Sequence, residues 1–272
     1  MAEEALRQAA DAIIREARAC GASDIHISEG MQTRYRVHGR LVQAQTQYRA
    51  DETAELLQSM MNEKQKKHFA NGNDADFAIR TSDGCRQRVN VFRQQKKIAA
   101  TIRLLNSTIP TLEDLKMPTI LYKMAMEPRG LILVTGPTGS GKSTTLAAMI
   151  EHMNQNSDRH IITIEDPIEY VYESKQSLIH QREVGEDITD FASAIRSALR
   201  EDPDVILVGE MRDYETISTA LLAAETGHLV LSTLHTTGAA QTVERIVDAC
   251  PTGGQNQVRA QLAGTLKGIV SQ

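Results

Sequence analysis

The chain has 272 residues, which is long enough for two ordinary domains with separate hydrophobic cores. No apolar run approaches the length of a membrane-spanning helix, and the first residues lack the basic and apolar regions of a secretory signal, so we expect a cytoplasmic protein. The formal net charge of −5 argues against a nucleic-acid partner, and the three widely spaced cysteines argue against a disulfide framework or a zinc site.

The first part of the chain mixes helical and alternating patterns. Apolar residues recur at helical spacing through residues 4–20, and Gly21 is placed to end that helix. Alternating segments at residues 24–28 and 34–37 predict strands, and a second helix is expected over residues 51–69. Three more predicted strands cover residues 75–80, 86–92 and 97–103, with a turn at residues 82–84. Residues 1–105 are therefore predicted to form a small α+β domain.

The periodic pattern lapses over residues 106–118, which contain two prolines, so we predict a linker and a hinge there. From residue 119 to residue 272, apolar segments alternate with helical patterns. The predicted strands are residues 131–134, 161–164, 205–208 and 229–231. Near-continuous apolar strands separated by helices are typical of a parallel sheet covered on both faces, so an α/β domain is expected.

A glycine-rich segment, residues 136–143, lies between the first of these strands and a helical pattern, and it has the form of a Walker A loop. The backbone N–H groups of such a loop surround phosphate oxygens, Lys142 reaches the β- and γ-phosphates, and the Ser143 hydroxyl binds Mg²⁺. The predicted nucleotide-binding residues are Gly136, Pro137, Thr138, Gly139, Ser140, Gly141, Lys142, Ser143 and Thr144. The sequence therefore predicts a nucleotide site.

Acidic residues follow two other predicted strands. Glu165 and Asp166 follow residues 161–164, at the edge of the sheet where α/β proteins bind ligands, although adjacent acids also occur in solvated loops. Glu210 follows residues 205–208, as the acid does in a Walker B strand. In that position Glu210 can orient or deprotonate the attacking water, or hold a water on Mg²⁺. The alternative for Glu210 is an acid at the start of a helix near Asp213.

Two histidines, His228 and His235, bracket the last predicted strand. Histidines at the ends of strands are often only polar edge residues. Beside a γ-phosphate they could instead sense the nucleotide, by donating a hydrogen bond to the phosphate or to Glu210. A role of these histidines in sensing the nucleotide is therefore a hypothesis.

Four segments follow one another along the chain, at residues 136–144, 162–170, 199–213 and 226–236. They resemble the Walker A, aspartate, Walker B and histidine boxes of the type II/IV secretion ATPase superfamily, and they are most similar to the PilT-like retraction ATPases of type IV pili. Residues 22–28, 36–39 and 112–115 resemble the N-terminal domain and linker of the same family. The resemblance therefore covers nearly the whole chain.

The resemblance implies a PAS-like N-terminal domain, a flexible linker and a RecA-like ATPase domain, assembled as a homohexamer with ATP and Mg²⁺ between subunits. It implies that Glu210 is catalytic and that Glu165 supports Mg²⁺ or water, so the implied metal residues are Ser143, Glu165 and Glu210. Arginines of the N-terminal domain are expected to complete the site. The matching segments offer Arg86, Arg88 and Arg103, although strand arginines are also commonly solvated surface residues.

The implied function is a hexameric ATP-hydrolysing motor that powers pilus retraction and twitching motility. It would act with an inner-membrane platform protein and associate with the cytoplasmic face of the membrane only through partners. Two alternatives use the same residues: a pilus assembly or type II secretion ATPase, and a nucleotide-switched regulator of the motor. A DNA-translocating ATPase is disfavoured by the acidic balance and by the lack of Trp. Family members usually continue into a C-terminal helical region, so we expect this chain to be truncated there.

Overall fold

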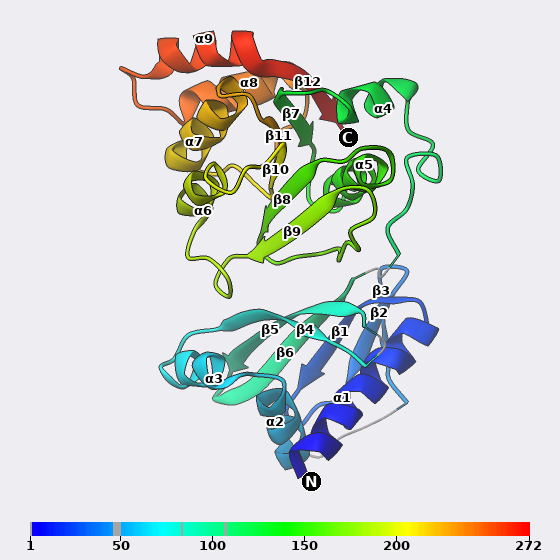
Figure 1. Cartoon of the computed structure of the whole chain (residues 1–272). Helices are drawn as coiled ribbons and strands as arrows, with labels where there is room; N and C mark the ends of the chain where they lie inside the picture. Colours follow the sequence, from blue (N-terminus) through cyan, green and yellow to red (C-terminus); the bar gives the residue numbers. More distant parts are fainter. Residues whose placement is uncertain (1, 46–49, 83, 106–107) are drawn as a thin grey trace. The chain divides into compact units, whose positions relative to one another are not determined.

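The computed structural model describes residues 2–45, 50–82, 84–105 and 108–272. The chain forms two compact units, Met1–Ser107 and Thr108–Gln272 (Figure 1). Residue 83 of the predicted turn and residues 106–107 of the predicted linker lie outside the described residues. Among the described residues, no helix combines the length and the apolar character needed to span a bilayer.

Within the described residues, the first unit is built on an antiparallel sheet of six strands in the order β3-β2-β1-β6-β5-β4. The strands are β1 (Ala22–Ser28), β2 (Arg34–Val37), β3 (Arg40–Gln43), β4 (Ala75–Arg80), β5 (Arg86–Gln94) and β6 (Lys97–Leu104), and the helices are α1 (Ala2–Ala19), α2 (Ala50–Ser59) and α3 (Glu63–Ala70). Ile13 of α1 and Leu56 of α2 share a core with Ile102 of β6. The predicted α+β character and the five predicted strands of this region are confirmed.

The prediction of one helix over residues 51–69 is wrong, because the helix is interrupted between Ser59 and Glu63. Asn62 caps α3: its side chain accepts the Gln65 N–H at 2.9 Å, and the Gln65 side chain accepts the Asn62 N–H at 2.8 Å. This reciprocal capping box satisfies backbone donors locally, so a new helix starts there. The structure also contains β3, which the sequence pattern did not predict. A tight turn with positive φ at His38 and Gly39 pairs it with β2.

The second unit contains a sheet in which all paired strands are parallel, in the order β12-β7-β11-β10-β8-β9. Its strands are β7 (Gly130–Thr135), β8 (His160–Glu165), β9 (Leu178–Glu183), β10 (Val205–Val208), β11 (Leu229–Leu234) and β12 (Leu266–Ser271). Its helices are α4 (Thr119–Ala125), α5 (Lys142–Asn156), α6 (Phe191–Ala198), α7 (Tyr214–Glu225), α8 (Ala239–Asp248) and α9 (Gln255–Thr265). The predicted mixed α/β fold with a parallel sheet is confirmed.

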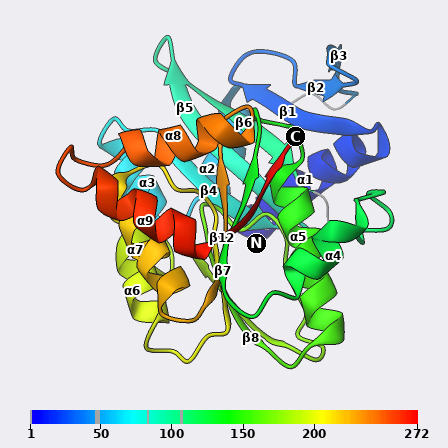
Figure 2. The same cartoon turned by 90° about the horizontal axis from the view of Figure 1, so that it is seen from above.

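Both faces of this parallel sheet are buried. Along β7, Leu131 and Leu133 belong to the core on one side, whereas Ile132 and Val134 belong to the core on the other. Helices α6, α7, α8 and α9 cover the first face, and α4 and α5 cover the second (Figure 2). This arrangement explains the continuous apolar runs, because successive side chains of a strand point to opposite faces and here each face needs an apolar side chain.

The two edge strands, β9 and β12, were not predicted. Each pairs with one neighbour in the described sheet, and Leu178 of β9 is half-exposed, so neither needs a continuous apolar run. The described part of the predicted linker, residues 108–118, packs on the second unit. Leu112 is buried in the same core as Leu121 of α4.

Candidate nucleotide site

The carboxyl ends of the parallel strands meet at one edge of the sheet, here called the carboxyl edge. The register pairs Thr135 of β7 with Leu234 of β11, and Val208 of β10 with Ile164 of β8. The phosphate loop (residues 136–143), Glu165, Glu210 and His235 lie at or just beyond these strand ends. The structure therefore brings together, at one edge, four features that are far apart in the sequence.

The phosphate loop joins β7 to α5. Gly141 has a φ of 97° and is the residue before the first turn of α5, a conformation that glycine adopts without strain. A Cβ on Gly136 would lie 2.4 Å from the Gln272 carbonyl oxygen, so this position also requires glycine. The free N–H groups of the first turn of α5 make this a favourable place for an anion. Ser143 is exposed in that turn, as binding to phosphate or Mg²⁺ requires.

Lys142 is the first residue of α5 and is largely buried. Its ammonium group donates hydrogen bonds to the carbonyl oxygens of Gly136 and Pro137, each at 2.9 Å. Burial lowers the pKa of Lys142, whereas the negative charges of Glu169 and Glu210 act in the opposite direction. Lys142 therefore interacts electrostatically with the acid that follows β10.

Glu165 is the last residue of β8. Its Oε1 atom accepts a hydrogen bond from the Thr163 hydroxyl at 2.6 Å and one from the Gln181 amide at 3.3 Å. Burial raises the pKa of Glu165 to about 7 even though these hydrogen bonds favour the charged form. Glu165 is thus a half-buried residue whose carboxyl group is hydrogen-bonded to side chains of β8 and β9. Asp166, by contrast, is exposed.

Glu210 lies just beyond β10, and only 19% of its side chain is exposed. Its carboxylate forms an ion pair with Arg212 at 2.6 Å, and its Oε2 atom lies 3.9 Å from Nε2 of His235. Asp213, and not Glu210, is the N-cap of α7, since its side chain accepts the Thr216 N–H. The Glu210 carboxylate is therefore not used to start the helix.

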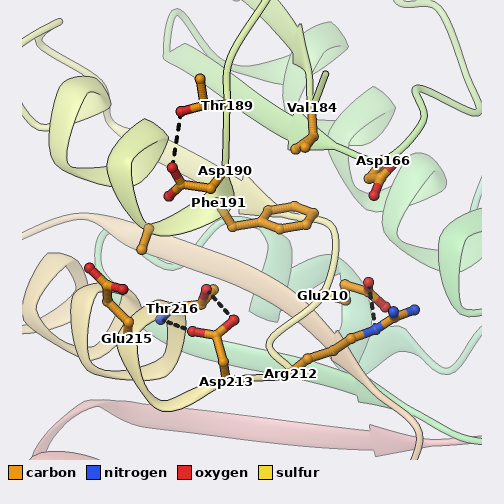
Figure 3. Close-up of a pocket in the computed structure, with 11 residues that line it drawn as sticks. Asp166, Val184, Thr189, Asp190, Phe191, Glu210, Arg212, Asp213, Glu215 and Thr216 are labelled. Atoms are coloured by element: carbon orange, nitrogen blue, oxygen red, sulfur yellow. Dashed lines mark hydrogen bonds and ion pairs between the residues drawn. The ribbon is translucent and has the colours of Figure 1, made fainter. Parts of the chain in front are cut away.

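A pocket of about 380 Å³ opens beside Glu210. Its lining residues come from the segments just beyond β8, β9 and β10 and from the starts of α6 and α7, and none belongs to the phosphate loop. Figure 3 shows the Phe191 ring projecting between the capped starts of the two helices and the Glu210–Arg212 ion pair. Glu210 therefore lines a pocket to which the phosphate loop does not contribute.

The two histidines have different positions. His235 follows β11 at the carboxyl edge, whereas His228 precedes the same strand at the opposite edge, here called the amino edge. A strand of this length separates them by about 20 Å. The His228 ring donates to the Ala223 carbonyl at 2.9 Å, and its backbone carbonyl accepts the Gly130 N–H. Within this unit the strand therefore holds His228 at the edge opposite the phosphate loop, and His235 is the histidine near Glu210.

The candidate arginines all lie on the sheet of the first unit. Arg88 forms a two-point ion pair with Asp76 across β4 and β5, with distances of 2.6 and 3.1 Å. Arg103 pairs with Asp24 at 3.1 Å and is the register neighbour of Arg88 on β5. Arg86 lies two residues before Arg88 on the same strand and is half-buried. The structure therefore places Arg88 and Arg103 side by side.

The residues at the carboxyl edge fit a Mg²⁺ ion bound together with a nucleotide. The available ligands are a serine hydroxyl and carboxylate oxygens, which suit a hard cation. Among the described residues, no group of three or more His, Cys, Asp or Glu side chains could hold a metal by itself. Mg²⁺ commonly completes its coordination with phosphates and water, so Ser143, Glu165 and Glu210 are the residues that would hold it here.

Several residues of this edge were not predicted from the sequence as site residues. Tyr170 places its hydroxyl 3.0 Å from the Thr144 hydroxyl, and Gln181 contacts Glu165 from the edge strand β9. Glu169 acts electrostatically on Lys142. Gln181 carries no sequence signal, because β9 itself was not predicted. A search for polar residues on an edge strand next to Glu165 would have been needed to find it.

Together these groups can bind the phosphates of a nucleotide and place an acid near the terminal phosphate.

A family model described as Type II/IV secretion system protein matches residues 2–272. The chain is 53% identical over 238 residues to the "Twitching motility protein" of Neisseria gonorrhoeae, covering 87% of this chain and 64% of that protein.

It is also 49% identical over 255 residues to the "Type IV pilus retractation ATPase PilT" of Pseudomonas aeruginosa, covering 93% of this chain and 74% of the relative. The crystal structure of the pilus retraction motor PilT with bound ADP matches with a TM-score of 0.90 and 49% identity, over 95% of this chain and 76% of the other. The chain thus spans about two thirds to three quarters of these relatives. It belongs to the type II/IV secretion system protein family.

Proposed function

We propose that the second unit binds ATP with Mg²⁺ and hydrolyses it. The observation that carries this proposal is the position of Glu210, at the carboxyl edge and within electrostatic reach of Lys142. A protein that used nucleotide only as a switch would need no carboxylate able to orient or deprotonate a water molecule. This position therefore favours an enzyme over a nucleotide-switched regulator.

In the proposed reaction Lys142 and the loop N–H groups bind the β- and γ-phosphates, and Ser143 contacts the metal. Mg²⁺, when bound, neutralises charge on the phosphates. Glu210 orients the attacking water and accepts its proton. Glu165 supports the metal or its water from the end of β8. His235 lies 3.9 Å from Glu210. A change in the charge of that carboxylate would therefore act on His235 and on the residues that follow β11.

We further propose that the first unit is a PAS-like domain and the second a RecA-like domain, and that six chains form a ring with ATP between subunits. In such a ring, arginines of the first unit would complete the site and neutralise charge on the transferred phosphoryl group. Arg88 and Arg103 are the candidates, together with Arg86. Each of the first two would exchange its aspartate partner for phosphate, so Asp76 and Asp24 would hold the arginines until nucleotide binds.

The proposed physiological role is pilus retraction in twitching motility. Relatives with 49–53% identity carry the names of a retraction ATPase and a twitching motility protein. ATP held by Lys142 on one side and by arginines on the other would draw the domains together and hydrolysis would release them, which converts chemical energy into movement. The partner would be an inner-membrane platform protein, reached from the cytoplasmic face. Pilus assembly or secretion by the same site chemistry is the alternative.

The first experiment measures the ATPase rate against protein concentration, with the mass determined by light scattering on the same samples. A specific rate that rises as a hexamer forms supports a site completed between subunits. A rate that stays constant in a monomer contradicts the ring proposal. No hydrolysis at any concentration contradicts the enzyme proposal.

A second experiment distinguishes the two directions of the motor. The chain is expressed in a bacterium that lacks its own retraction ATPase and is piliated but cannot twitch. Restored twitching supports retraction. Restored piliation in an assembly-ATPase deletion strain, without restored twitching in the first strain, would instead support the assembly alternative.

A further inference from the structure

The segment between β8 and β9, residues 166–177, forms neither a helix nor a strand, yet two side chains of β9 hold its backbone. The Ile168 N–H donates to the Glu183 carboxylate at 3.0 Å. The Tyr172 N–H donates to Oε1 of Gln181 at 2.9 Å, and Nε2 of Gln181 donates to the Tyr170 carbonyl at 2.7 Å. Residues 181 and 183 point to the same side of β9, so both side chains can contact this segment.

Gln181 has one more contact, and it is with the candidate site. The same Nε2 atom that binds the Tyr170 carbonyl lies 3.3 Å from Oε1 of Glu165. One carboxamide group therefore joins the β8–β9 segment to a carboxyl group at the carboxyl edge. An amide has two N–H donors and one oxygen acceptor, so the three contacts account for its donors and an acceptor position.

The held segment also reaches the phosphate-loop helix. The Tyr170 hydroxyl lies 3.0 Å from the Thr144 hydroxyl, in the turn that contains Lys142 and Ser143, and Tyr170 is buried. Nearer to β9, Asn154 of α5 accepts the Lys175 N–H at 2.9 Å and donates to the Glu173 carbonyl at 2.8 Å. The segment is thus fastened to α5 at two points and to β9 through Gln181 and Glu183.

We propose that Gln181 is a positioning residue for ATP hydrolysis. Its carboxamide fixes the Glu165 carboxyl group and the backbone around Tyr170 in one arrangement, so that Glu165 and the Tyr170–Thr144 contact keep their places beside the phosphate loop. Gln181 itself does not touch the nucleotide. This inference rests on the proposed ATPase activity and names a residue on which that activity depends.

Two substitutions separate the donors of Gln181 from its acceptor. Gln181→Met keeps the volume and removes every hydrogen bond, whereas Gln181→Glu keeps an acceptor for the Tyr172 N–H but, when ionised, has no donor for Glu165 or Tyr170 and adds a negative charge beside Glu165. Both are expected to lower kcat by about 10- to 100-fold, the usual effect of removing a group that orients a metal-site ligand. The KM for ATP should change less than about threefold, because the phosphate loop is intact.

The matched control is Arg182→Gln, which changes the next residue of β9 and breaks a surface ion pair with Glu201. Its kcat should equal that of the wild type. The amount of bound fluorescent ATP analogue per chain, measured for every variant, corrects kcat for the folded fraction. Near-normal kcat in Gln181→Met would overturn the proposal, since turnover would then need none of the hydrogen bonds of Gln181.

A double-mutant cycle tests whether Gln181 acts through Glu165. In the Glu165→Gln background, Gln181→Met should change kcat by less than about twofold, because residues that act as a unit are not additive. The same loss in both backgrounds overturns the proposal while leaving the ATPase assignment intact. A wild-type chain that hydrolyses no ATP overturns the proposed function and the catalytic half of this inference together.

Amide hydrogen exchange supplies a readout that does not depend on turnover. In Gln181→Met, the Tyr172 N–H loses its acceptor, so peptides covering residues 168–173 should exchange faster than in the wild type, while Gln181→Glu should keep the protection at Tyr172. Unchanged exchange of these peptides in Gln181→Met would contradict the hold of Gln181 on the segment, whatever the ATPase results.

Discussion

The two edges of the parallel sheet carry similar polar residues that are used in different ways. At the amino edge, His228 binds the Ala223 carbonyl, and Arg159 binds the carbonyls of Ala125 and Met126. These side chains satisfy backbone groups of nearby loops. At the carboxyl edge, Glu210 forms an ion pair with Arg212, lies 3.9 Å from His235 and lines a pocket. A polar group that closes a loop contributes to stability, whereas one directed at a pocket remains available for a ligand.

The comparison leads to a simple rule for this molecule. Substitutions at the carboxyl edge should affect nucleotide chemistry more than folding, and substitutions at the amino edge should do the reverse.

The largest effect is expected for Lys142→Ala. Loss of the buried ammonium group should weaken ATP binding and lower turnover by about a thousandfold, because a charge preorganised for phosphate is removed. Phosphate release and binding of a fluorescent ATP analogue measure the two effects. The control is Lys267→Ala, which removes a lysine at the amino edge that pairs with Glu127. Comparable losses in both variants would break the rule.

Glu210→Gln should keep ATP binding but lower kcat by about a hundredfold or more, because the amide cannot accept a proton from water. Equilibrium binding and single-turnover hydrolysis separate the two properties. Glu127→Gln, on the loop that precedes β7, is the matched change and should hydrolyse ATP normally. Equal turnover in Glu210→Gln and the wild type would remove the catalytic assignment.

Smaller effects are expected for His235 and His228, which compare the two edges directly. His235→Ala should lower kcat by about tenfold, equivalent to about 1.4 kcal/mol in the activation free energy. His228→Ala should leave kcat per folded chain unchanged but lower the free energy of unfolding by up to about 1 kcal/mol, since the Ala223 carbonyl loses the ring donor and keeps the His228 N–H and the Thr226 hydroxyl. Turnover and urea unfolding of both variants measure this. A larger catalytic loss in His228→Ala would show that this residue reaches a site outside its own unit.

The smallest effect on ATPase activity is expected at Glu151, near the end of α5 toward the amino edge. Burial opposes its ionisation, but hydrogen bonds from Lys175, Gln155 and Asn154 outweigh this effect and lower the pKa of Glu151. A lowered pKa in the folded state contributes stability above the unfolded-state pKa, and that contribution is lost as the pH falls through the folded-state value.

Glu151→Gln should therefore lower the free energy of unfolding by about 1–2 kcal/mol at pH 7, and the difference from the wild type should shrink as the pH falls below the ordinary Glu range. Chemical unfolding from pH 7 to pH 3 measures the difference. ATPase activity at pH 7 should not change. A difference that is constant across this pH range would show that the ionised carboxylate is not the stabilising form.

The sequence predicted the second unit well because its signals are local and strong. Each central strand is buried on both faces, so it is a continuous apolar run such as Val205–Val208. The phosphate loop depends on glycine conformations and on one lysine, which a short segment can specify. The predictions failed where the deciding contact was distant or where competing local bonds were stronger, as at Asn62, whose capping box ended the expected long helix.

By itself, the sequence determined the strand–loop–helix with a phosphate-binding pattern, the two acids at strand ends and the parallel direction of the core strands. Only the tertiary structure decided which polar residues share an edge. It brought His235 to within 3.9 Å of Glu210, and it brought Gln181 to Glu165 although 16 residues separate them in the chain. The physical reason is that hydrophobic periodicity records which face a residue occupies, whereas strand order, which sets the neighbours along an edge, depends on packing between distant segments.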